Sequence, residues 1–303
     1  MLLSGSKIAF GSLLAAIAAM LWGSAGTAQS FITQDGLNTL WVGAFRLLFA
    51  CAFFFPLLAL RSHSESRKQT SNCVFQFRYK ILLAGLSMAF FNLLFFTGVK
   101  EAGVALGSCT TIGSAPLWAG LFEYILHKEK PTKDWIVGIT IAVFGGIAMA
   151  LSQAQAIEFN PLGLGICVFA GFFYSLYSMT AKEIVKNVTP LQATSFTFLI
   201  AACIAGPVAW IASGFPTVYL SDLLIVMYLG VIVTGIAYLL YSTALKIINV
   251  STAVALGLLE PVVAFILAIV VVHEPISFGS TLGLSLILIG LAFVLRSENK
   301  HRS

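Results

Sequence analysis

The chain has 303 residues, of which 59% are hydrophobic and only 10% are charged. Soluble domains carry about 25% charged residues, so too few polar side chains remain here to cover a water-exposed surface. The formal net charge of +5 does not indicate a nucleic-acid partner, because the basic residues fall in short loops between apolar runs. We therefore expect the lipid bilayer to be the surrounding medium and exclude a nucleic-acid-binding domain.

Ten apolar segments are long enough to cross a bilayer, which takes about 20 residues per helix. Short turns rich in Gly, Pro, Asn or charge separate them, and no soluble domain fits between them. The longest connection, roughly residues 61–78, is polar. The predicted helices cover residues 8–32, 37–60, 79–99, 103–127, 132–152, 161–183, 190–213, 220–244, 249–273 and 277–296.

The basic residues predict the orientation. If the N-terminus lies in the cytoplasm, all 17 Lys and Arg residues except Arg46 and Lys100 fall on the cytoplasmic side. Arg46 lies within a predicted helix, and Lys100 lies in an outside loop. Cytoplasmic loops of membrane proteins carry an excess of Lys and Arg, so we predict that both termini are cytoplasmic.

An internal repeat divides the chain. A shift of 145 residues superposes five markers, namely Gly85 on Gly230, Pro116 on Pro261, Glu129 on Glu274, Gly138 on Gly283 and Gly145 on Gly290. We therefore predict two related five-helix halves, residues 1–152 and 153–303. Because five is odd, the second half must cross the membrane in the opposite sense. Inverted repeats of this kind enclose a midplane site in many secondary transporters.

Several motifs in chain order resemble one family. They are "AAMLWGS" (18–24), "VGAFRLLFA" (42–50), "YLLYSTALK" (238–246) and "LEPVVAFILAIVVVHEPI" (259–276), with a weaker first-half counterpart, "SAPLWAGLFEYILHKEKP" (114–131). The chain resembles the drug/metabolite transporter superfamily, specifically the EamA-type ten-helix carriers. It departs from an exact repeat at Ala115, which aligns with Glu260. The resemblance implies a carrier of small metabolites in the cytoplasmic (inner) membrane, often an exporter of amino acids or related compounds.

A carboxylic acid, Glu260, occupies the middle of the ninth predicted helix, directly before Pro261. A charged carboxylate at the bilayer centre costs at least about 2.5–3.5 kcal/mol, so the neutral form is favoured unless a cation compensates. Ala253, Gly257 and Ala264 share the helix face of this acid. We predict that Glu260 faces a central pathway and binds a proton or a cationic group of the substrate. The alternative is that it bonds backbone groups freed by the proline.

Other polar and aromatic residues lie deep in the predicted helices. Such groups predict a cavity for a polar or aromatic solute, including a cation held against ring faces. The alternative for Tyr and Trp is a belt at the membrane surface. Arg46 either reaches an acid or a substrate carboxylate, or extends to the membrane surface. Ser114 either lines the cavity or bonds its own helix. The substrate-binding candidates are Trp22, Gln29, Arg46, Asn92, Ser114, Tyr174, Tyr177, Tyr238, Tyr241 and Glu260.

Two prolines, Pro116 and Pro261, interrupt long apolar helices at matching positions of the repeat. Proline removes a backbone hydrogen bond, so each site predicts either a gating hinge or a static bend. The fifth and tenth helices carry glycines seven residues apart, and Gly279 and Gly283 have a small-xxx-small spacing. This spacing predicts a close helix contact, or a homodimer formed through these two helices.

The sequence argues against enzymatic chemistry. The four histidines lie at helix ends or in loops, and no metal-binding or hydrolase motif occurs within a span. The five cysteines include no CxxC pair and are typical of small buried residues. We therefore predict no catalytic residue, no metal and no cofactor. The predicted partners are the substrate and the bilayer, besides the homodimer alternative for the fifth and tenth helices.

The predicted function is secondary transport. The solute is a small polar or amphipathic metabolite, an amino acid or a related amine, which is exported by alternating access with proton coupling through Glu260. The alternative is proton-coupled or facilitated uptake of a cationic metabolite. An intramembrane enzyme and a receptor or scaffold without transport are less favoured.

Overall fold

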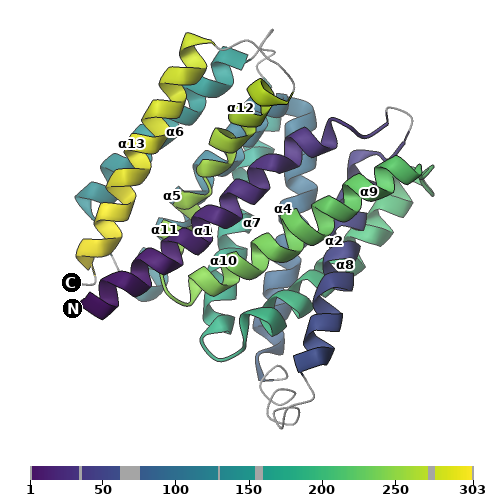
Figure 1. The fold of residues 1–303 in the computed structure, drawn as a ribbon, viewed down its shortest axis with the longest axis horizontal. Helices are drawn as coiled ribbons and strands as arrows, with labels where there is room; N and C mark the ends of the chain where they lie inside the picture. Colours follow the sequence, from purple (N-terminus) through teal and green to yellow (C-terminus); the bar gives the residue numbers. More distant parts are fainter. Residues whose placement is uncertain are drawn as a thin grey trace.

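The computed structural model describes residues 2–33, 36–61, 76–128, 130–153, 160–271 and 277–301. Over these ranges the chain is entirely helical and contains no strand. Figure 1 shows the helices packed in one bundle, with both chain termini at the same end. We call this the termini end, and the opposite end the mouth end. The repeat markers Glu129 and Glu274 and most of the polar connection that follows residue 61 lie outside the described ranges.

The predicted spans are found in order, with ends that differ by a few residues. Within the described residues, nine helical segments are long and apolar enough to cross a membrane, which confirms an all-α membrane protein. The remaining predicted span corresponds to α5, which has 24 residues and is not among these nine. The elements are α1 (Leu2–Gln29), α2 (Thr39–Arg61), α4 (Arg78–Ala102), α5 (Val104–His127), α6 (Lys133–Gln153), α7 (Pro161–Val185), α8 (Pro190–Ser213), α9 (Leu220–Tyr228), η1 (Leu229–Ile236), α10 (Ala237–Leu245), α11 (Val250–Leu256), α12 (Leu259–Val270) and α13 (Phe278–His301).

Local sequence explains where two of the helices begin. At the start of α7, the Asn160 side chain accepts hydrogen bonds from the backbone N–H groups of Leu162 and Gly163, and a proline occupies the first helical position. At the start of α8, Thr189 and Gln192 form a capping box, again followed by a proline. These residues satisfy N–H groups that a helix leaves unpaired at its beginning.

The span after Tyr219 is not a regular α-helix. Its middle part, η1, is a π-helix, in which Thr234 Oγ1 donates a hydrogen bond to Leu229 O at 2.8 Å. A side chain built on Gly230 would lie 2.9 Å from the carbonyl oxygen of Arg46 on α2. The glycine therefore lets η1 approach the α2 backbone closely.

The next span is broken between α11 and α12, three residues before Pro261. The Glu260 N–H donates to Gly257 O at 2.9 Å, which is the tighter spacing of a 3₁₀ turn. The repeat places Ile112 where the second half has Gly257, and glycine is the poorer helix former of the two. α5 runs through Pro116 as one helix, and the hinge or bend predicted there stays a prediction.

The α6 and α13 helices pack against each other in opposite directions. A side chain built on Gly138 would lie 2.6 Å from Gly290 O, and one built on Gly145 would lie 2.7 Å from Gly283 O. Figure 1 shows the two helices side by side at one edge of the bundle. These glycines allow close backbone contact within the chain, so a homodimer, which stays a prediction, would need other faces of the two helices.

The core lies between the two halves of the chain. In the first half, α4 packs on α7 and α8, whereas in the second half η1 packs on α1 and α2. Likewise α5 packs on α7, and α12 packs on α1. Each half therefore packs its middle helices against the first helices of the other half.

Candidate functional site

A cavity of about 830 Å³ lies between the two halves of the chain. Its lining residues at the mouth end, such as Ser30, Thr39 and Lys100, are exposed. Its lining residues further in, such as Tyr238 and Leu258, are buried. The cavity is thus open at the mouth end and closed toward the termini end. Its size falls within the range of small-molecule sites, about 300–1,000 Å³.

Arg46 on α2 brings a cationic group into the cavity. Its Nη2 atom donates a hydrogen bond to Asn92 Oδ1 on α4 at 3.2 Å. The Asn92 amide is only 4% exposed and is itself oriented by a bond from its Nδ2 atom to Met88 O at 2.9 Å. The buried Nε atom of Arg46 has no hydrogen-bond partner among the described residues. The guanidinium therefore keeps unused donor capacity next to the cavity.

Glu260, in the first turn of α12, is the acidic residue of the cavity lining. Its side chain is half-buried and interacts electrostatically with Arg46, yet the two side chains, both of which the structure describes, form no direct ion pair. Both residues line the cavity. A cationic group and an acidic group are thus both available to a solute.

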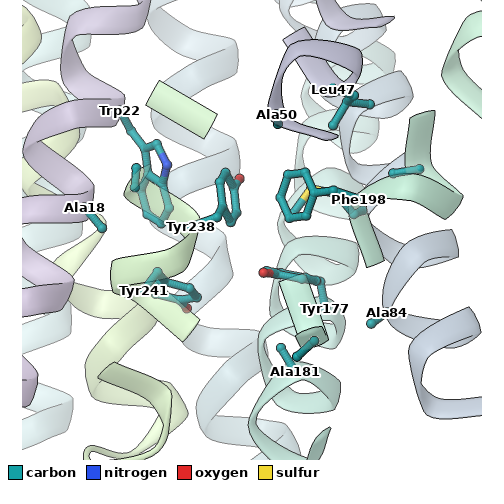
Figure 2. Close-up of a cluster of buried hydrophobic side chains, with 14 of the residues drawn as sticks. Ala18, Trp22, Leu47, Ala50, Ala84, Tyr177, Ala181, Phe198, Tyr238 and Tyr241 are labelled. Atoms are coloured by element: carbon teal, nitrogen blue, oxygen red, sulfur yellow. The ribbon is translucent and has the colours of Figure 1, made fainter. Parts of the chain in front are cut away.

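Aromatic rings close the inner part of the cavity. The Trp22 ring on α1 lies 4.9 Å from that of Tyr238 and 6.2 Å from that of Tyr174, measured between centroids, and all three residues line the cavity. Figure 2 shows Trp22, Tyr238 and Tyr241 grouped together. The Trp22 Nε1 atom is buried without a hydrogen-bond partner in the described part of the chain. This aromatic floor offers ring faces to an apolar or cationic group.

Most of the predicted binding residues line this cavity, and three do not. Tyr177 and Tyr241 lie behind the aromatic floor, where Tyr241 donates a hydrogen bond to Ser178 Oγ at 2.9 Å. Ser114 donates to Thr111 O within its own helix at 3.1 Å, as the alternative interpretation expects. The predicted residues in the lining are Trp22, Gln29, Arg46, Asn92, Tyr174, Tyr238, Glu260 and the hinge candidate Pro261.

The structure adds lining residues that sequence reasoning did not propose as binding residues. Lys100 lies at the mouth, and it was distinguished in the sequence only as the lone basic residue of the outside loops. Cys109 also lines the cavity, although no sequence pattern separates it from the other cysteines. Gly23 lies against the backbone of Glu260, and its place in the "LWGS" motif was the available signal.

An apolar helical bundle with a charged and aromatic cavity at its centre is typical of multi-pass membrane transporters, and the family match identifies the chain as a transporter and not an enzyme. In a bacterial cell such a protein lies in the cytoplasmic (inner) membrane. The model of the EamA-like transporter family matches residues 9–151 and again residues 161–296, so the chain belongs to this family.

Individual relatives agree with this assignment. The chain is 30% identical over 292 residues to the uncharacterized transporter YwfM of Bacillus subtilis (strain 168), covering 96% of each chain. It is 23% identical to the probable amino-acid metabolite efflux pump of Escherichia coli (strain K12), over 68% of this chain and 73% of that protein. A solved crystal structure superposes with a TM-score of 0.77 over 97% of this chain and 99% of the other, at 20% identity, which shows a shared fold.

Proposed function

We propose that the protein is a secondary transporter that exports an amino acid or a closely related metabolite by alternating access. The observation that carries this proposal is the joint presence of Arg46, Glu260 and the aromatic floor in one cavity. An amino acid has a carboxylate, an ammonium group and a side chain, and this lining has a complementary group for each. The Escherichia coli relative, named as an amino-acid metabolite efflux pump, supports the same substrate class.

Each lining group has a defined role in this proposal. Arg46 pairs with the substrate carboxylate, for which its planar donors suit a bidentate contact. Glu260 accepts hydrogen bonds from the ammonium group. Trp22, Tyr174 and Tyr238 pack against the substrate side chain. In a membrane, leaving either charge unpaired is costly, so a zwitterion that satisfies both is favoured over a solute that satisfies one.

The proposed architecture is a pair of inverted five-helix repeats, residues 1–152 and 153–303, with both termini in the cytoplasm. Two observations support it. The family model matches the chain twice, and the α6 and α13 helices, which occupy equivalent places in the repeat, pack in opposite directions. The exchanged packing of the middle helices is also what a twofold relation between the halves produces. With this orientation, the described cavity opens to the outside of the cell.

We further propose that Glu260 carries a proton when no cationic group is bound. Protonation removes the cost of a lone charge in the membrane, so proton and substrate compete for the same carboxylate. Inward proton movement then drives outward substrate movement. Replacing Glu260 by Gln keeps the shape of the side chain but prevents proton exchange. We expect the E260Q variant to transport equally with and without a pH gradient, whereas the wild type is faster with one.

A second candidate function is the uptake of a cationic metabolite. The acid next to aromatic rings favours it, because ammonium groups bind to ring faces as well as to carboxylates. Under this alternative Arg46 would not contact the substrate, and a carboxylate on the solute would be unnecessary.

A transport assay in liposomes separates the two functions. Purified protein is tested with phenylalanine, with phenethylamine, which lacks the carboxylate, and with 3-phenylpropionate, which lacks the ammonium group. Preferential transport of the amino acid supports the proposal. Preferential transport of the amine supports the alternative, and an Arg46→Gln variant should then behave as the wild type. If the protein transports none of these three compounds and no other amino acid, the proposal is contradicted.

A further inference from the structure

Three charged side chains at the termini end play no part in the cavity. Glu123 on α5 is 7% exposed and Glu298 on α13 is 2% exposed, while Lys182 on α7 is half-buried. None of the three belongs to the cavity lining. Charged groups removed from water are costly unless they are paired and hydrogen-bonded, so their contacts indicate what they hold.

All three side chains bond to one short segment, residues 248–252, which comprises the end of the connection after α10 and the first turn of α11. The Val250 N–H donates to Glu123 Oε1 at 2.6 Å, and the Asn249 N–H donates to Glu298 Oε1 at 3.1 Å. The Thr252 hydroxyl donates to Glu298 Oε2 at 2.5 Å. From α7, Lys182 Nζ donates to Ile248 O at 2.6 Å. The segment is thus held by charge-assisted hydrogen bonds from three helices at once.

The held segment leads directly to the substrate cavity. It passes into α11, whose residues 250–256 are all buried. This helix ends at Leu256, a turn at residues 257–258 follows, and Glu260 lies in the first turn of α12. Val254 of α11 lines the cavity, so one face of the helix closes the cavity toward the termini end. A displacement of residues 248–252 would therefore also displace the closed end of the cavity and Glu260.

We propose that Glu123, Lys182 and Glu298 form a latch that keeps the termini end of the transporter closed, and that its release lets α11 move and the cavity open to that side. The inference rests on the proposed alternating access and names the contacts that one of its two states needs. Buried charges add little to stability compared with apolar residues of the same volume, but removing the partner of a buried charge is strongly destabilising. Such contacts suit a closure that must be formed in one state and absent in the other.

The native Cys109 provides a reporter, because it lines the cavity that is open at the mouth end. The other cysteines are replaced (Cys51→Ala, Cys73→Ala, Cys167→Ala and Cys203→Ala). A membrane-impermeant methanethiosulfonate reagent is then added to the mouth side of intact cells, and the rate of Cys109 labelling is measured at one pH. This rate reports the fraction of molecules whose cavity is open to that side.

The latch variants are Glu123→Gln and Glu298→Gln, which remove the charge and keep the shape. We expect each to lower the labelling rate by about fivefold, the lower end of typical coupling between sites, since the equilibrium shifts away from the mouth-open state. The matched control is Glu183→Gln. Glu183 is an acid at the same end of the bundle that bonds Lys186, Lys80 and His127 instead of residues 248–252.

Unchanged labelling in the latch variants, or an equal fall in the control, would overturn the latch. If a Gln variant does not fold, Thr252→Val carries the test, because it removes the hydroxyl bond to Glu298 while keeping the side-chain shape. The labelling needs no substrate. A failure of amino-acid transport in liposomes is therefore distinguishable from a failure of the latch.

Discussion

At the scale of single residues, the hydrogen bond from Arg46 to Asn92 sets the direction of the cavity's cationic group. Because Asn92 is itself fixed by Met88 O, the guanidinium is oriented before a substrate arrives. Preorganised groups lose less conformational entropy on binding, which favours affinity. The polar amide of Asn92, buried in the middle of a membrane helix, is explained by this orienting contact.

We expect Asn92→Ala to raise KM about tenfold in the liposome assay, since a hydrogen bond to a charged group contributes about 1.5–3 kcal/mol. The control is Thr97→Val on the same helix, because the Thr97 hydroxyl bonds Leu93 O at an exposed position outside the cavity lining. Equal KM values for Asn92→Ala and the wild type would mean that the amide does not orient Arg46 for binding.

Gly23 is a second residue whose role follows from contact geometry. A Cβ atom at this position would lie 2.6 Å from the carbonyl oxygen of Glu260 and 2.7 Å from Val263 Cβ. We expect Gly23→Ala to lower the free energy of unfolding by about 1–3 kcal/mol, as overpacking does, and to reduce transport by displacing Glu260. Thermal unfolding in detergent and the liposome assay measure the two effects.

The matched control for this prediction is Gly26→Ala, one turn further along α1. A Cβ atom there meets nothing within 4 Å, although Gly26 also lines the cavity. The substitution should leave the melting temperature unchanged or raise it, because alanine is the better helix former. Equal melting temperatures for the two variants would contradict the proposed close packing of α1 on α12.

At the scale of elements, the α6–α13 pair depends on backbone contact between glycines. We expect Gly145→Ala to lower the melting temperature, because its Cβ atom would lie 2.7 Å from Gly283 O, a backbone atom that a side-chain rotation cannot move away. Gly206→Ala on α8 is the control, since nothing lies within 4 Å of that position. A Gly145→Ala protein that melts like the control would show that these helices separate without cost.

The sequence predicted where the helices lie better than how they are deformed. Apolar length locates a span, and the prolines at the starts of α7 and α8 mark helix beginnings. The π-helix η1 was not predicted, and the close approach of its Gly230 to the Arg46 backbone is a tertiary contact that a single sequence does not reveal. The break before α12 was attributed to Pro261 alone, although Gly257 supplied an additional signal.

At the scale of the whole molecule, the proposed orientation makes a direct prediction. Green fluorescent protein fused after Ser303 should fluoresce, because the C-terminus lies in the cytoplasm. Alkaline phosphatase fused after Phe215, in the connection between α8 and α9, should be active, because it requires the outside compartment. An active phosphatase at the C-terminus, with the fluorescent protein dark there, would reverse the membrane orientation that the basic residues predict.

The sequence predicted how deep the site residues lie in their spans, but only partly which way their side chains face. Trp22, Asn92, Tyr174 and Glu260 each lie within a span, away from its ends, and the bundle brings all four to the cavity lining. Tyr241 lies one turn from Tyr238 yet faces the core, because the rotation of a helix about its axis depends on packing with its neighbours. A single sequence gives that rotation only where one face is clearly polar.

The glycine contact between α6 and α13 has a mechanical consequence. Backbone rests on backbone there, at Gly138 against Gly290 and at Gly145 against Gly283, so sliding of one helix along the other would break this fit. We therefore expect these two helices to move as one rigid unit, relative to which the other eight spans tilt during the proposed transport cycle.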